Sequence, residues 1–85
     1  MNRKKLLRRL AQGAVRNVAF DEFRGLVLGF GFSQARVNGS HHIFVHPKIP
    51  ELLNLQNVAG EAKPYQIRQF LRLVERYNLT MEESQ

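Results

Sequence analysis

Three histidines, His41, His42 and His46, lie within a stretch of six residues and are the only histidines in the 85-residue chain. An imidazole changes its protonation state near neutral pH, so each could act as a general acid, a general base or a metal ligand. The remaining alternative is that all three are simply polar residues of a strand. The role open to each histidine depends on the direction in which the backbone points its ring.

The residues before the histidines predict a β-hairpin. Asn38-Gly39 favours a type I′ turn, in which both central residues have positive φ, and apolar residues lie on either side of it. We therefore expect residues 32–37 to lead into the turn and residues 40–46 to return antiparallel beside them.

This hairpin would bring a fixed positive charge close to an imidazole. In a two-residue turn, partners are counted outward from the loop, so Arg36 should lie opposite His41 and Ala35 opposite His42. Burying an unpaired arginine is costly, so we expect Arg36 and His41 on the open face of the sheet. A cation beside a titratable imidazole suits phosphate chemistry.

The spacing of the histidines disfavours a metal site. In a strand, His41 and His42 point to opposite faces, and His42 and His46 stand about 13 Å apart. That separation is too large for two ligands that each lie about 2 Å from one zinc ion. The chain has no cysteine, which also excludes thiolate ligands and disulfides. We expect no metal ion and no other cofactor.

Acid–base cleavage of RNA suits the histidines better than metal binding. The ribose 2′-OH is a built-in nucleophile, so an enzyme has to remove its proton, stabilise the phosphorane and protonate the leaving 5′-oxygen. A histidine can perform either proton transfer, and Arg36 could offset charge on the phosphoryl oxygens. Taken without further information, the alternative of polar strand residues is the simpler one.

Composition favours a nucleic-acid partner. The 13 Lys and Arg residues exceed the 7 Asp and Glu residues, which gives a net charge of +6 and a pI of about 10.6, and a basic domain suits a polyanion. The hydrophobic share of 44% supports one core, so we expect a single domain over residues 1–85.

No apolar run in the sequence approaches the roughly 20 residues of a membrane span. We therefore expect a cytoplasmic protein without a membrane partner.

Residues 1–13 form a basic N-terminal extension of this domain. Residues 2–12 are predicted to be helical, with Leu6, Leu7 and Leu10 on one stripe and Gly13 as a stop. This helix could dock its leucines on the domain, contact RNA, or face a partner protein. A membrane-surface role is disfavoured because three leucines bury too little area.

The core is expected over residues 18–79. A helix should begin near Ala19, a third strand should cover residues 51–58, and a final helix should begin at Pro64. The two prolines in residues 47–50 predict an exposed loop, residues 60–63 predict a turn, and the tail after Leu79 is expected to fray. The fold class is therefore α+β, with a three-stranded antiparallel sheet, helices on one face and an extra N-terminal helix.

Two segments resemble the HicA toxins, small ribonucleases that pair with HicB antitoxins. They are Gly39-Ser40-His41-His42-Ile43-Phe44, after an apolar helix that ends in Gly-Phe, and the segment Gly60–Arg68 with its Lys-Pro-Tyr-Gln sequence. The resemblance covers residues 20–79. The chain departs from the family in residues 52–56, where many members carry a proline and a histidine-bearing strand, and in its basic N-terminal helix.

The resemblance implies a fold similar to a double-stranded-RNA-binding domain and cleavage of mRNA without a metal. It implies that His41 is the catalytic residue, and that a HicB-like antitoxin joins this otherwise monomeric chain in a hetero-oligomer. Ile49, Leu52 and Leu53, together with the N-terminal leucines, are candidate exposed anchors for that partner. A non-catalytic RNA-binding module of the same fold is the alternative. The candidate RNA-binding residues are Arg36, Gly39, Ser40, His42, Lys63, Arg68 and Arg72.

The arginines of the last helix have a second interpretation. Arg68, Arg72 and Arg76 recur at every fourth residue, so they share one side of the helix. Such a row is either a solvated helix surface or a track for phosphates.

Overall fold

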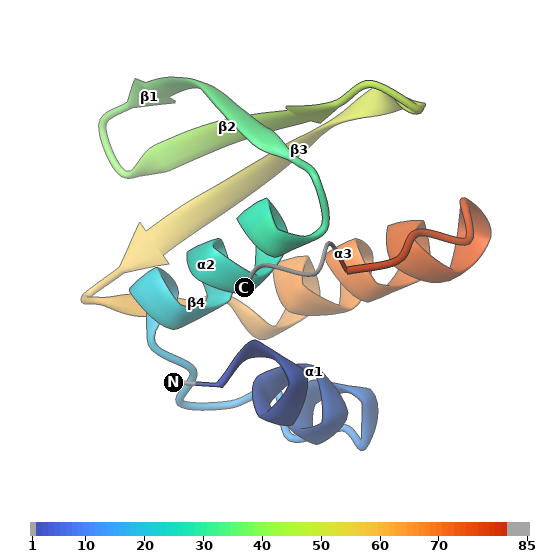
Figure 1. The fold of residues 1–85 in the computed structure, drawn as a ribbon. Coiled ribbons are helices and arrows are strands. Elements are labelled where there is room, and N and C mark those ends of the chain that lie inside the picture. Colours follow the sequence, from blue (N-terminus) through green and yellow to red (C-terminus); the bar gives the residue numbers. More distant parts are fainter. Residues whose placement is uncertain (1, 82–85) are drawn as a thin grey trace.

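The structure, a computed structural model, describes residues 2–81 as an α+β fold of three helices and a four-stranded antiparallel sheet (Figure 1). The expected fraying of the tail concerns mainly residues 82–85, which lie outside the described residues. Along the sheet the strands follow the order β1-β2-β3-β4. In chain order the elements are α1 (Arg3–Ala11), α2 (Phe20–Gly29), β1 (Ser33–Asn38), β2 (His41–His46), β3 (Ile49–Val58), β4 (Glu61–Ala62) and α3 (Pro64–Arg76).

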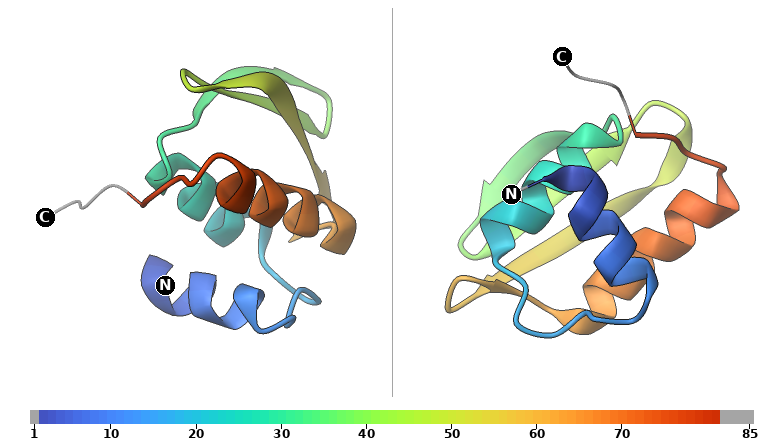
Figure 2. Two further views of the ribbon diagram at one scale, coloured as in Figure 1. Left: turned by 90° about the vertical axis from the view of Figure 1, so that its right-hand side faces the viewer. Right: turned by 60° about the horizontal axis from the view of Figure 1, so that its bottom comes forward.

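The elements form three layers. The sheet is one layer, α2 and α3 lie against one of its faces, and α1 lies on the far side of these two helices (Figures 1 and 2). In the described part of the chain, no helix covers the opposite face of the sheet. The prediction of helices on one face and an open second face is confirmed. None of the three helices has the length and apolar character that a membrane crossing requires.

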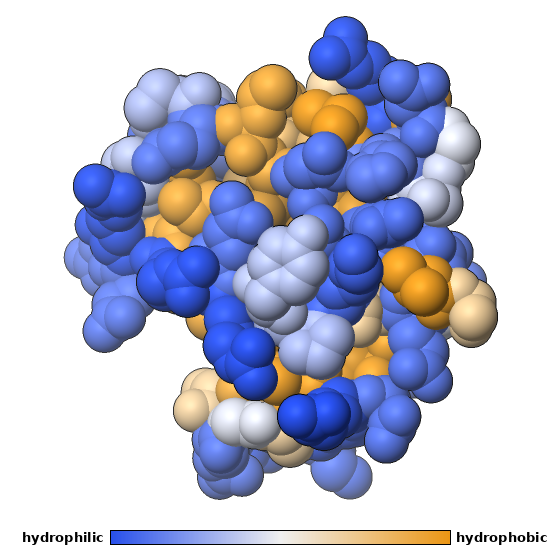
Figure 3. Space-filling model, turned by 180° about the vertical axis from the view of Figure 1, so that it is seen from behind, coloured by the Kyte–Doolittle hydropathy of each residue, from blue (hydrophilic) through white to orange (hydrophobic). Residues whose placement is uncertain are grey.

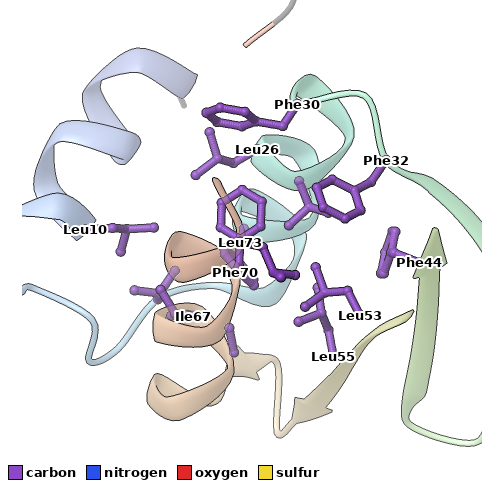
Figure 4. Close-up of a cluster of buried hydrophobic side chains, with 14 of the residues drawn as sticks. Leu10, Leu26, Phe30, Phe32, Phe44, Leu53, Leu55, Ile67, Phe70 and Leu73 are labelled. Atoms are coloured by element: carbon purple, nitrogen blue, oxygen red, sulfur yellow. The ribbon is translucent and has the colours of Figure 1, made fainter. Parts of the chain in front are cut away.

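The hydrophobic core lies between the sheet and the helices and is centred on Phe70 of α3. The Phe70 ring lies 5.4 Å from the ring of Phe23, 5.5 Å from Phe30 and 5.9 Å from Phe32, measured between centroids. Edge-on and tilted arrangements of this kind are the favoured ones for aromatic pairs. Strand side chains such as that of Leu53 point toward these rings (Figure 4). Alternate strand residues therefore face the core, and the residues between them face outward.

Helix α1 is part of the packed domain. Leu6 and Leu10 are each only 1% exposed. The Asn2 side chain caps the helix by accepting hydrogen bonds from the backbone N–H groups of Lys4 and Lys5. The Arg3 side chain lies over α2, since a Cβ atom at Gly29 would stand 3.1 Å from Arg3 Nη1. The interpretation in which this helix docks its leucines on the domain is confirmed.

The structure corrects the extent of the third strand. β3 begins at Ile49, so residues 49 and 50 belong to a strand and only Pro47 and Lys48 form the turn. A proline is excluded from the middle of a sheet because it cannot donate to the ladder. Here β4 pairs only with Asn57 and Val58, so Pro50 lies in a part of β3 that has no strand on its far side.

The fourth strand was not predicted. The sequence predicts a turn over residues 60–63. Glu61 and Ala62 instead form β4, and the turn before them consists of Ala59 and Gly60. Both turn residues have positive φ, at 52° and 85°, as a type I′ turn requires. An alanine in that conformation is uncommon, so this hairpin has no clear signal in the sequence.

Side chains of α3 bind the far edge of β3. Gln66, which is 6% exposed, accepts the backbone N–H of Gln56 through its Oε1 at 2.8 Å. At the other end, the Tyr77 hydroxyl, just after α3, donates to Glu51 Oε1 at 2.6 Å. Arg76 Nη1 lies 3.6 Å from the second oxygen of Glu51. These contacts hold α3 along β3 and satisfy a backbone donor that no strand reaches.

Candidate active site on the open face of the sheet

The hairpin turn is one residue later than the sequence predicted. Asn38 pairs with His41 and Val37 pairs with His42, so the two turn residues are Gly39 and Ser40. The predicted partners, Arg36 for His41 and Ala35 for His42, are therefore wrong. Gly39 has a φ of +65°, whereas Asn38 and Ser40 do not have positive φ. This pattern is that of a type II′ turn, which needs positive φ only at its first central residue and favours glycine there.

The changed register still leaves Arg36 on the face of His41, because the pairs run without interruption from the turn to Arg36. The ladder pairs Gln34 with Phe44 and Arg36 with Ile43, and Ala35 between them has no partner. Partners across a ladder share a face, so Arg36 lies on the face of Ile43, which is also that of His41. Arg36 and His41 are diagonal neighbours on adjacent strands, so their Cα atoms are about 7–8 Å apart. A long side chain such as that of arginine can span this distance.

His41 lies on the open face of the sheet. Phe44 and His46 of the same strand are buried at 0% and 9% exposure, whereas His41 is exposed. The sequence expectation that His41 and Arg36 share the open face agrees with this geometry. Both stand at the end of the hairpin, where a large substrate can reach them.

Asn54 of β3 orients the imidazole of His41. His41 Nδ1 lies 3.3 Å from Asn54 Oδ1. When the amide oxygen is the acceptor, Nδ1 carries the proton and Nε2 keeps its lone pair directed away from the contact. That tautomer leaves Nε2 available as a proton acceptor. Sequence reasoning missed Asn54, although a lone asparagine between two leucines is a detectable signal.

The turn residues support this site through their backbone conformation. A Cβ atom added at Gly39 would meet nothing within 4 Å, so the glycine is required by its positive φ and not by lack of space. Gln56, which pairs with His41, donates from Nε2 to Ser40 Oγ at 3.4 Å. The polar side chains of β3 therefore brace both the turn and the histidine.

The other two histidines do not face His41. His42 is half-buried on the helix-covered side, where its ring lies 4.7 Å from the Phe20 ring. His46 Nε2 lies 3.0 Å from the carbonyl oxygen of Phe30, and the backbone N–H of Lys48 donates to His46 Nδ1 at 3.0 Å. Because a carbonyl only accepts and an N–H only donates, the neutral Nε2–H tautomer of His46 satisfies both partners.

The described side chains do not form a metal-binding site. Across residues 2–81, no cluster of three or more histidine, aspartate or glutamate side chains could hold a metal ion.

The remaining predicted RNA-binding residues lie on another surface. Lys63 precedes α3, with its ammonium group 5.5 Å from the centre of the Tyr65 ring. Arg68 and Arg72 are exposed on α3, which packs against the covered face of the sheet. The structure therefore does not bring these three cations together with His41.

Positive charge is concentrated on the helices. Arg36 is the only lysine or arginine within the four strands, whereas α1 and α3 together carry eight of the 13. The open face of the sheet instead combines polar groups with the apolar side chains of Ile43, Val45 and Leu52, of which Leu52 is 55% exposed. Seen from behind, hydrophobic atoms gather at the top of the molecule, where the sheet lies (Figure 3).

Two of the three strand residues expected to be exposed anchors are buried, and so are the N-terminal leucines Leu6 and Leu10. Ile49 is 6% exposed and Leu53 is 0% exposed, because both point toward the helices. Leu52 lies between them on the opposite face and remains accessible. Strand alternation explains the difference.

The contact between α3 and β3 shifts the pKa of both of its partners. The hydrogen bond from Tyr77, together with the charge of Arg76, lowers the pKa of Glu51. The same hydrogen bond and partial burial raise the pKa of Tyr77. Since these groups join α3 to β3, we interpret the shifts as the result of a structural contact.

Comparisons with protein-family models, with curated proteins and with solved structures found no match.

Proposed function

We propose that the protein is a metal-independent endoribonuclease in which His41 is the catalytic residue. The observation that carries this proposal is the exposed His41 imidazole, held through Nδ1 by Asn54 on the same sheet face as Arg36. A general base must reach the 2′-OH of a ribose, and an accessible Nε2 at the end of a hairpin can do so.

The proposed reaction uses the 2′-OH of the substrate as the nucleophile. His41 Nε2 removes the proton of this hydroxyl, and its oxygen attacks the adjacent phosphorus. Arg36 offsets the charge on the phosphoryl oxygens, and the bond to the 5′-oxygen breaks. The products are a 2′,3′-cyclic phosphate and a 5′-hydroxyl. Because His42 and His46 point elsewhere, the proton for the leaving oxygen comes from water or from protonated His41.

The family assignment is part of the same proposal. Apart from the short β4, the elements from α2 to α3 follow the order helix, three strands, helix of a double-stranded-RNA-binding domain. The HicA-like segments fall on the β1–β2 turn with β2, and on β4 with the start of α3. We therefore assign the chain to HicA-type toxins that cleave mRNA in the cytoplasm. In this assignment α1 and β4 are additions to the core.

A HicB-like antitoxin is the proposed partner of the toxin. Leu52, Ile43 and Val45 offer an apolar contact on the face that carries His41, and an acidic partner would complement Arg36. Such a partner would cover the site and form a hetero-oligomer with an otherwise monomeric toxin. Co-expression with the neighbouring reading frame should restore growth and yield a complex. Equal growth with and without that frame, and no complex, would refute the toxin–antitoxin assignment.

The decisive test is cleavage of mRNA in excess chelator. The parent protein should cut RNA and leave 2′,3′-cyclic phosphate ends, and His41→Ala should lose cleavage while it keeps RNA binding. A requirement for a divalent ion would refute the mechanism. If the parent binds RNA without cutting it, the alternative of a non-catalytic RNA-binding module is correct.

A further inference from the structure

The β1–β2 hairpin carries polar groups on its covered side as well as on its open face. β1 is the outer strand of the sheet (Figure 1), and all six of its residues are exposed. The helices therefore do not seal the inner side of this strand. Val37, which pairs with His42 on that side, is still 49% exposed. Solvent, and hence a ligand, can reach this side of the hairpin.

Three side chains from different elements meet there. Gln34 Oε1 of β1 lies 3.4 Å from Arg24 Nε of α2 and 3.1 Å from His42 Nδ1 of β2. With the amide oxygen as the shared acceptor, His42 Nδ1 carries a proton and its Nε2 points away from Gln34. The Phe20 ring, 4.7 Å from that of His42, fixes the plane of the imidazole.

Arg24 has unused donor capacity in this cluster. Its contact with Gln34 uses Nε, which leaves both Nη groups of the guanidinium, and the described residues show no ion pair for this side chain. The nearest acidic residues on α2, Asp21 and Glu22, instead line a hollow with Arg3 between α1 and α2. A planar pair of N–H donors that no carboxylate neutralises is suited to a phosphate.

The position of the cluster connects it with the proposed active site. His41 and His42 are consecutive residues at the turn end of β2, and their side chains leave on opposite faces. An RNA strand bound at His41 can pass over the Gly39-Ser40 turn and reach Arg24 on the other side. No other element of the described chain pairs with the outer edge of β1.

We propose that Arg24, held by Gln34 beside His42, binds a second phosphate of the RNA strand whose cleaved linkage lies at His41. This inference rests on the proposed function and extends it. The hairpin is then held by the substrate from both sides, and Arg24 positions the strand without touching the reacting atoms.

The test uses an RNA oligonucleotide with 2′-O-methyl groups throughout, which cannot supply the 2′-OH nucleophile. Its dissociation constant is measured by fluorescence anisotropy over a range of salt concentrations, for the parent and for Arg24→Gln. Losing one phosphate contact should reduce the slope of log affinity against log salt by about 0.7. Arg16→Gln, which removes the same charge at an exposed position between α1 and α2, should keep the parent slope.

A second readout follows the arginine itself. The Nε–H NMR resonance of Arg24 should shift when the oligonucleotide is added to the parent protein, and Gln34→Leu should weaken binding without a change of slope. Equal slopes for Arg24→Gln and Arg16→Gln would overturn the inference, even if His41→Ala abolishes cleavage. A parent protein that binds no RNA would overturn both the inference and the proposed function.

Discussion

Replacing His46 with phenylalanine should destabilise the protein while leaving the chemistry proposed for His41 unchanged. The substitution keeps an aromatic ring beside Phe32, whose ring lies 4.9 Å away, but it removes both polar contacts of the imidazole. The Phe30 carbonyl then loses its donor at 3.0 Å, and the Lys48 N–H loses its acceptor at 3.0 Å.

The magnitude follows from the two unsatisfied groups. An unpaired buried polar group costs about 1–3 kcal/mol, and the Lys48 N–H belongs at the lower end because Lys48 itself is exposed. The sum is roughly 2–4 kcal/mol. A domain of this size has a total stability of roughly 4–13 kcal/mol, so Tm should fall on the order of 10–30 °C.

Urea denaturation at neutral pH measures this loss, and graded variants identify its source. His46→Asn can keep the acceptor for Lys48 and His46→Gln can keep the donor to Phe30, so each should lose about half as much as His46→Phe. The matched control is His41→Phe, the same change at an exposed position of the same strand, with an expected effect within about 0.5 kcal/mol. A His46→Phe protein as stable as this control would refute the reasoning.

Three further perturbations test other parts of the structure. Asn54→Ala removes the partner of His41 Nδ1. The loss of one neutral hydrogen bond worth about 1 kcal/mol should lower the kcat of RNA cleavage roughly fivefold. An unchanged kcat would exclude the role of Asn54 in orienting His41. Leu10→Ala should destabilise the domain by about 2–4 kcal/mol in urea, because the side chain is 1% exposed, and a loss below about 1 kcal/mol would show that α1 is dispensable. Tyr77→Phe should raise the pKa of Glu51 toward its ordinary value in an NMR titration, since the Tyr77 hydrogen bond is the main cause of its lowering. A carboxyl whose pKa is lowered in the folded state stabilises the protein above its unfolded pKa, and this contribution is lost as the pH falls through the folded pKa. Tyr77→Phe should therefore lose less stability on acidification than the parent protein. Equal losses in the two proteins would contradict the role given to the Tyr77 hydrogen bond.

The sequence predicted the helices well because their signals are local. Asn2 and Gly13 mark the ends of α1, and Pro64 marks the start of α3, by effects within one helical turn. The sheet was predicted less well because its details depend on partners that the sequence does not name. Pro50 is compatible with a strand only because β4 is too short to reach it.

The candidate site was predicted in position but not in detail. The exposure of His41 and its shared face with Arg36 follow from alternation and from the cost of burying an arginine. The register of the hairpin depends on which two residues form the turn. The segment Asn38-Gly39-Ser40 is compatible both with a type I′ turn at Asn38-Gly39 and with a type II′ turn at Gly39-Ser40. Asn54 lies 13 positions from His41 along the chain, and only the pairing of β2 with β3 brings the two together.

The far edge of β3 determines how this small sheet can associate with other molecules. An uncovered strand edge can recruit a strand from another chain and so lead to aggregation. Here Pro50 has no N–H to offer, and the N–H of Gln56 is already taken by Gln66. Both ends of the edge are therefore closed to a regular ladder, and growth of the sheet into a fibre is discouraged on this side. The surface that stays open to the proposed antitoxin is the face of the sheet that carries Leu52 and His41.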